Sequence, residues 1–95
     1  LGGDFDLRRF EHVARYDVVG QRIEMHLRSL GGQCVNVRRA GMVVRMKAGE
    51  TIHTESCHKF RLEQIGDMAR AGGFRVEAQW TEDDWGFAES LLRAV

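Results

Sequence analysis

Residues 22–29 read RIEMHLRS, and this stretch is the most regular part of the sequence. Ile23, Met25 and Leu27 are apolar, and each is flanked by charged or polar side chains. Successive side chains of a β-strand point to opposite faces, so a period of two predicts a strand with one buried face. We therefore expect a strand here with Met25 on its apolar face, where core packing is the default role.

Two more short strands are predicted downstream, at Cys34–Arg38 and Met42–Met46. The glycine pair Gly31-Gly32 precedes the first of them, and a turn near Ala40-Gly41 separates the two. Glycines in such short connections are typical of β-hairpins. Together with residues 22–29, these segments predict a three-stranded antiparallel meander.

The segments on either side of this meander are less regular. Between Phe5 and Val13 the apolar spacing predicts a short helical or irregular entry. Residues 52–55 predict an extended segment or a short fourth strand.

The second half of the chain changes period. Apolar residues recur at helical spacing from Phe60 to Ala69, and Gly72-Gly73 supplies a helix stop. Residues 74–80 and 87–95 are strand-like, with a polar loop between them. This order predicts an α/β chain that is α+β as an isolated piece. The helix and the last two strands have too few partners for a complete sheet, so we expect an upstream part that is missing here.

Composition limits the classes of partner. The chain carries 14 basic and 14 acidic side chains, so no net charge attracts it to nucleic acid or acidic membranes. No apolar run approaches the length of a membrane span. Two cysteines do not make a disulfide framework, which favours a reducing compartment. We expect a cytoplasmic location and neither a nucleic-acid nor a membrane partner.

Residues 50–60, ETIHTESCHKF, gather the side chains most suited to chemistry. On a regular strand His53 and Cys57 share a side while His58 points away. The spacing matches no common zinc motif, so we expect no metal site. Nucleophile and base are usually remote in sequence, so a hydrolase built on Cys57 and His53 is the least favoured reading.

Glu55 stands at the end of an extended segment and just before the predicted helix. A carboxylate there can accept a hydrogen bond from a cationic or N–H-bearing ligand. It can equally cap the helix or interact with its dipole. The residues alone leave both roles open.

The stretches that carry a family resemblance lie in order along the whole chain: DFDLRRFEHVARYD, RIEMHLRS, AGETIHTESCHKF, ARAGGF and QWTEDDWGFAESLL. The sequence resembles the C-terminal part of the histidine-specific, S-adenosylmethionine-dependent methyltransferases. Known members of that family make the Nα-trimethylhistidine of the ergothioneine pathway. The TE.S.KF element, about thirty residues after RIEM, is the most specific part of the match.

The resemblance implies a Rossmann-like methyltransferase domain with a second α/β domain inserted into it. Residues 1–55 then correspond to the C-terminal part of the substrate-binding domain, which contains the meander. Residues 56–95 correspond to the closing helix and β-hairpin of the methyltransferase domain. The chain has no GxGxxG-like loop, so the resemblance implies an S-adenosylmethionine site mostly in the missing N-terminal part. We expect no catalytic or cofactor-binding residue in these 95 residues.

The resemblance also implies roles for three residues in the substrate side-chain pocket. Glu55 matches the acidic residue that contacts the substrate imidazole, and Met25 matches a pocket-lining methionine. Cys57 stands where the family usually has a serine that bonds the same ring. A thiol is a weaker hydrogen-bonding group than a hydroxyl, so L-histidine or a related amino acid is the expected acceptor.

A second reading belongs to a different class. The chain could be a non-catalytic, stand-alone binding or interaction module derived from the same family. The exposed edges of an incomplete sheet would favour pairing with the missing N-terminal half or with another copy.

Overall fold

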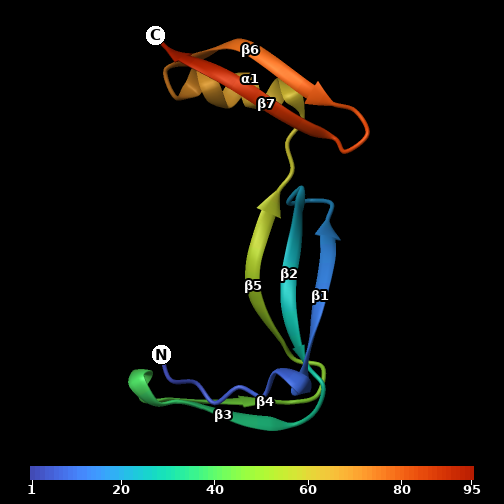
Figure 1. The fold of residues 1–95 in the computed structure, drawn as a ribbon, viewed down its shortest axis with the longest axis vertical. Helices are drawn as coiled ribbons and strands as arrows, with labels where there is room; N and C mark the ends of the chain where they lie inside the picture. The colour runs from blue at the N-terminus through green and yellow to red at the C-terminus, as the bar shows by residue number, and fades with distance from the viewer. The chain divides into compact units, whose positions relative to one another are not determined.

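The computed structural model describes all 95 residues as two compact units, Leu1–Lys59 and Phe60–Val95 (Figure 1). Every strand pair in both units is antiparallel, and the second unit contains one α-helix. The predicted α+β fold class is therefore confirmed. No helix is both long and apolar enough to cross a membrane.

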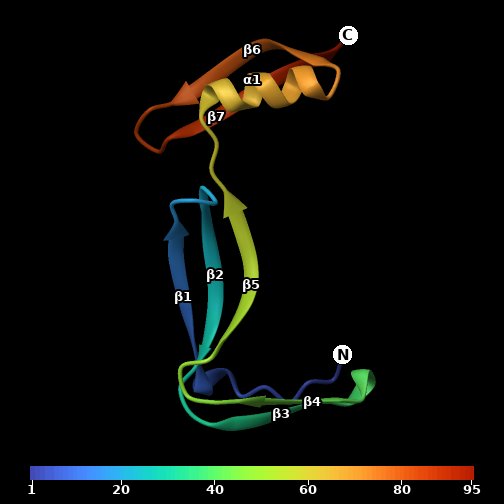
Figure 2. The same cartoon turned by 180° about the vertical axis from the view of Figure 1, so that it is seen from behind.

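A three-stranded sheet forms the larger part of the first unit (Figure 2). Its strands, in the spatial order β1-β2-β5, are β1 (Phe10–Asp17), β2 (Arg22–Ser29) and β5 (Thr51–His58). The strand predicted over residues 22–29 is confirmed residue for residue. Because β2 is the central strand, the residues of RIEMHLRS have neighbours on both sides.

The turn between β1 and β2 is stabilised by one carboxylate. Asp17 Oδ1 accepts hydrogen bonds from the backbone N–H groups of Val19 and Gly20, each at 3.1 Å. A Cβ at position 20 would lie 2.5 Å from the other oxygen of Asp17. A side chain at position 20 would therefore have to displace the Asp17 carboxylate, which favours glycine at this turn.

A second hairpin pairs β3 (Gln33–Val37) with β4 (Met42–Met46). Between them a short 3-10 turn, Arg38–Ala40, ends at Gly41 in the left-handed region, with φ of 58°. Val35, Val37 and Met46 are the buried apolar side chains of this unit. The N-terminal segment extends the hairpin through a bridge from Gly3 to Val37.

The predicted meander is correct for β3 and β4 and wrong for β2, which pairs with β1 and β5 instead of β3. The end of β2 is tied to the start of β5, because Ser29 N–H donates to the Glu50 carbonyl and Gly49 N–H donates to the Ser29 carbonyl, each at 2.8 Å. The Gly31-Gly32 connection consequently leads the chain away from β2. The entry segment was also predicted incorrectly from Phe10 onward, where β1 begins after a 3-10 turn.

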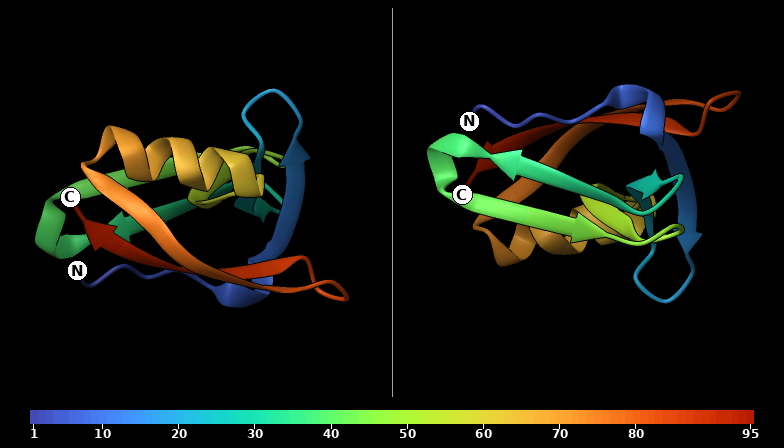
Figure 3. Two further views of the ribbon diagram at one scale, coloured as in Figure 1. Left: turned by 90° about the horizontal axis from the view of Figure 1, so that it is seen from above. Right: turned by 90° about the horizontal axis from the view of Figure 1, so that it is seen from below.

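The second unit is a helix on a hairpin, with the helix along one face of the two strands (Figure 3). Its elements are α1 (Leu62–Ala71), β6 (Phe74–Glu82) and β7 (Phe87–Ala94), in the predicted order. At the helix start the Gln64 side chain accepts from the backbone N–H of Arg61. At its end Gly72 donates to helix carbonyls and Gly73 has φ of 80°, as a glycine stop requires.

The boundary between the two units follows Lys59 in the sequence, and β5 runs without a break from Thr51 to His58. The predicted domain boundary, between Glu55 and Ser56, falls inside this strand. The assignment of residues 1–55 and 56–95 to two family domains stays a prediction.

Candidate functional site

The ladder between β2 and β5 contains a one-residue slip that decides which side chains share a face. His26 pairs with His53, whereas the next pair along β2 is Met25 with Glu55. Thr54 is therefore the extra residue of a β-bulge. Beyond it the pairs are Glu24 with Ser56 and Ile23 with Cys57.

One face of the sheet carries a charged cluster centred on Glu24. Arg15 Nε donates to Glu24 Oε2 and Arg22 Nη2 donates to Glu24 Oε1, both at 2.9 Å. His26 Nε2 lies 3.2 Å from Glu24 Oε2. The hydrogen bond from Arg15, followed by that from His26, lowers the pKa of Glu24 from 4.5 to about 2. Glu24 is therefore an ionised, buried carboxylate with its oxygens already engaged.

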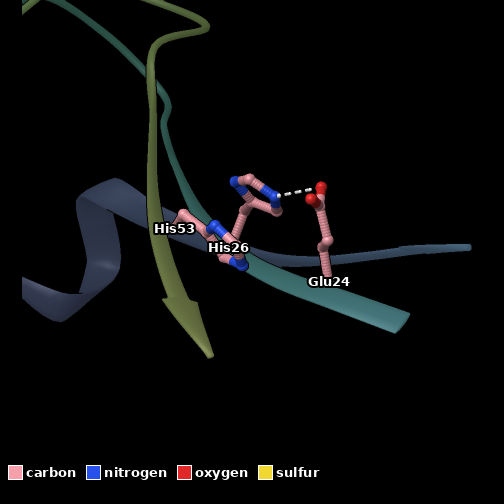
Figure 4. Close-up of side chains that lie close together, drawn as sticks. All are labelled: Glu24, His26 and His53. Carbon is pink, nitrogen blue, oxygen red and sulfur yellow. Dashed lines mark hydrogen bonds and ion pairs between the residues drawn. The ribbon is translucent and has the colours of Figure 1, made fainter. Parts of the chain in front are cut away.

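Two histidines extend this cluster (Figure 4). The rings of His26 and His53 stack with centroids 4.6 Å apart and an interplanar angle of 14°. His26 Nδ1 lies 3.1 Å from the Thr51 hydroxyl, which leaves both of its ring nitrogens occupied. His26 is buried by this cluster, although the alternation of residues 22–29 places it on the polar side of the strand.

Glu24, His26 and His53 bring ligand-type atoms within 4.8 Å of one another. A divalent cation would have to displace the hydrogen bonds of both Glu24 and His26 and sit beside two guanidinium groups. The arrangement is better described as a hydrogen-bonded ion-pair cluster than as a metal centre. Sequence reasoning missed it, although residues 24 and 26 of a strand necessarily share a face.

The opposite face brings together the three residues predicted to line a pocket. Met25 faces Glu55 directly across the ladder, and Cys57 follows two positions after Glu55 on the same side. Glu55 is exposed and its carboxylate makes no hydrogen bond or ion pair within its unit. Cys57 is a half-buried free thiol, and Met25 is half-buried.

An apolar cavity of about 540 Å³ continues this face toward the other end of the sheet. Its lining residues are Phe5, Leu7, Phe10, Leu27 and Ile52. Leu27 and Ile52 are a cross-strand pair on the far side of the bulge from Met25 and Glu55. This face of the three-stranded sheet therefore carries, along its length, the thiol of Cys57, the unpaired carboxylate of Glu55 and an apolar surface.

Because of this slip, the expectation that His53 and Cys57 share a side of the strand is wrong. His53 pairs with His26 on the charged face, and Cys57 pairs with Ile23 on the other. A bulge inverts the alternation of all residues beyond it, which the sequence period cannot reveal. The sheet thus separates the candidate base from the candidate nucleophile of a thiol hydrolase.

Comparison with known proteins gives a consistent match over the whole chain. A family model described as "Histidine-specific methyltransferase, SAM-dependent" matches residues 1–94. The chain is 40% identical over 91 residues to "Histidine N-alpha-methyltransferase" of Mycobacterium tuberculosis (strain CDC 1551 / Oshkosh). It is equally identical, over the same length, to the protein of that name from Mycolicibacterium smegmatis (strain ATCC 700084 / mc(2)155). The match covers 96% of this chain and 28% of each relative.

Proposed function

The chain belongs to the histidine-specific, S-adenosylmethionine-dependent methyltransferase family, and from this premise we propose that it supplies the substrate side-chain pocket of an amino-acid Nα-methyltransferase. The family membership confirms the resemblance read from the sequence. In the proposed reaction the α-amino nitrogen of L-histidine or a related amino acid attacks the sulfonium methyl group. The new N–C bond forms as the S–C bond breaks, and S-adenosylhomocysteine leaves.

The observation that carries this proposal is the contrast between two glutamates on adjacent strands. Glu24 is buried and held by two arginines, so it has no capacity for a ligand. Glu55 is exposed and unpaired within its unit, beside Met25 and Cys57. A free carboxylate next to apolar and thiol side chains suits an imidazole ring, which offers an N–H donor on an apolar body.

The side chains of the proposed pocket indicate which part of the reaction these residues assist. Glu55, Cys57 and Met25 orient the acceptor, and none of them performs proton transfer in the proposed mechanism. Orientation alone can accelerate a displacement, because it holds the nucleophile in line with the methyl group. The chain spans 28% of the relatives' length, and we assign the methyl-donor site mainly to the rest of the protein.

The thiol at Cys57 tunes the acceptor specificity in this proposal. A thiol bonds an imidazole nitrogen less strongly than a hydroxyl does, which lowers the preference for histidine over related amino acids. Cys34 and Cys57 are both free. Two free thiols favour the reducing environment of the cytoplasm, where we place the protein.

The test uses the full-length gene product with S-adenosylmethionine and a panel of amino acids. Mass spectrometry should detect methyl groups added to the α-amino nitrogen of histidine or a close relative. Glu55→Gln should raise the acceptor KM by about tenfold to a hundredfold, because a hydrogen bond to a charged group contributes roughly 1.5–3 kcal/mol. Glu89→Gln, on β7, is the matched control and should leave KM unchanged.

Two results would contradict the proposal. Equal effects of the Glu55 and Glu89 substitutions would remove Glu55 from the pocket. Amino-acid binding without any methyl transfer would instead support the non-catalytic binding module.

A further inference from the structure

We propose that Thr54 and His53 are positioning residues, which hold a β-bulge so that Glu55 and Cys57 face the acceptor instead of the charged cluster. This inference rests on the proposed function and deepens it. It adds the residues that act through Glu55 without touching the acceptor themselves.

The register shows what the bulge changes. On the N-terminal side of Thr54 the pairs are Leu27 with Ile52 and His26 with His53. If that register continued without the extra residue, Glu55 would pair with Glu24 and Cys57 would pair with Arg22. Both side chains would then lie on the charged face, and Thr54 and Ser56 would replace them beside Met25 and Ile23.

Electrostatics disfavours that alternative arrangement. The Glu24 carboxylate is ionised, with its pKa lowered to about 2, and a second carboxylate directly opposite it would be repelled. Arg15 and Arg22 are already bonded to Glu24. The bulge therefore places the two glutamates on opposite faces of the sheet. Glu24 stabilises the charged cluster, and Glu55 remains available to the acceptor.

Two side-chain hydrogen bonds hold the bulge in place, and both end on the backbone of proposed pocket residues. The Thr54 hydroxyl donates to the carbonyl oxygen of Met25 at 3.0 Å. His53 Nε2 lies 3.1 Å from the carbonyl oxygen of Glu55, to which it donates in the tautomer that carries the proton on Nε2. His53 Nε2 is also 2.9 Å from the Ser56 hydroxyl.

The stacked His26 ring supports His53 from the other side. His26 is buried and anchored to Thr51 and Glu24, so it is a fixed surface for the His53 ring. The charged cluster is thus connected, through the stacked His53 ring and its bond to the Glu55 carbonyl, to the face of the sheet that carries the Glu55 and Cys57 side chains. This gives the cluster a function beyond stability.

The first test measures the register itself, independently of activity. In the full-length protein with Cys34→Ser, Ile23→Cys should form a disulfide with Cys57, because these residues are directly opposed. Arg22→Cys in the same background should form none, since residue 22 faces the other side. The reverse pattern of cross-linking would overturn the bulged register.

The second test measures the positioning role. Thr54→Val removes the hydroxyl and keeps the shape, and it should raise the acceptor KM by about threefold to tenfold, as expected for one lost hydrogen bond. S-adenosylmethionine affinity should stay unchanged, and Thr54→Ser should restore the KM. Thr81→Val is the matched control, because Thr81 lies on β6 in the second unit and has no part in the His26–His53–Thr54 arrangement.

The outcomes separate this inference from the proposed function. If Thr54→Val and Thr81→Val shift the acceptor KM equally, or if Thr54→Ser fails to restore it, the positioning role is overturned while the methyltransferase stands. If the wild-type protein neither binds nor methylates any amino acid, both proposals fall. The disulfide assay then still reports whether the bulge exists.

Discussion

Met25 and Glu55 lie directly opposite each other on β2 and β5, beside the single residue by which the two strands slip. The Thr54 hydroxyl bonds the Met25 carbonyl, and the His53 ring bonds the Glu55 carbonyl. The most irregular point of the ladder is therefore also one of its best-tethered points. Bulges commonly re-aim side chains next to functional sites, and this one turns Glu55 away from Glu24.

Replacing the thiol on this face should strengthen histidine binding. We expect Cys57→Ser to tighten histidine binding by about 1 kcal/mol, or about fivefold in Kd, because a hydroxyl is the better hydrogen-bonding partner. Isothermal titration calorimetry on the full-length protein measures this directly. Cys34→Ser, which alters an exposed thiol on β3, is the control and should have no effect. Unchanged or weaker binding by Cys57→Ser would show that Cys57 does not face the imidazole.

The Glu24 cluster should make stability depend on acid pH. Because its folded-state pKa is lowered from 4.5 to about 2, Glu24 contributes stability that is fully present above its ordinary pKa. That contribution should be lost as the pH falls from about 4.5 toward 2. The difference in Tm between wild type and Glu24→Gln should therefore shrink over this window. A constant difference, like that expected for Glu89→Gln, would contradict the coupling.

Removal of the buried histidine should destabilise the first unit. His26→Ala takes away partners of Glu24 and Thr51 and the surface on which His53 stacks. We expect a loss of about 1–3 kcal/mol in the free energy of unfolding, since buried polar groups lose their bonds. Urea denaturation measures it. His12→Ala, at an exposed position on β1, should change stability by less than about 0.5 kcal/mol.

A side chain at position 20 should destabilise the β1–β2 turn. A Cβ there approaches Asp17 Oδ2 to 2.5 Å, so Gly20→Ala must push away the carboxylate that holds the turn. We expect a loss of about 1 kcal/mol, comparable to one hydrogen bond. Gly31→Ala, whose nearest neighbour is a side-chain atom of Arg9 at 3.8 Å, is the control in the same thermal-unfolding experiment. Equal Tm values for the two variants would contradict this account of the turn.

Local periodicity predicted the elements whose pattern is complete within a few residues. The strand at residues 22–29, the hairpin strand at 42–46 and the glycine stop at Gly72-Gly73 are confirmed. The strand β1 was missed because Phe10–Val13 alternates poorly on its own, and its pairing with β2 supplies the missing order. The grouping of Met25, Glu55 and Cys57 came from the family resemblance, and their role in binding stays a proposal.

The sequence by itself determined that residues 22–29 form a two-faced strand with Met25 on the apolar side, and which family the chain resembles. The tertiary structure alone decided which side Glu55 and Cys57 take, and that His53 joins Glu24 and His26. The physical reason is the distance along the chain over which each property is set. Alternation is a property of neighbouring residues, whereas register depends on hydrogen bonds between strands far apart in the chain, and one extra residue at Thr54 reverses every face beyond it.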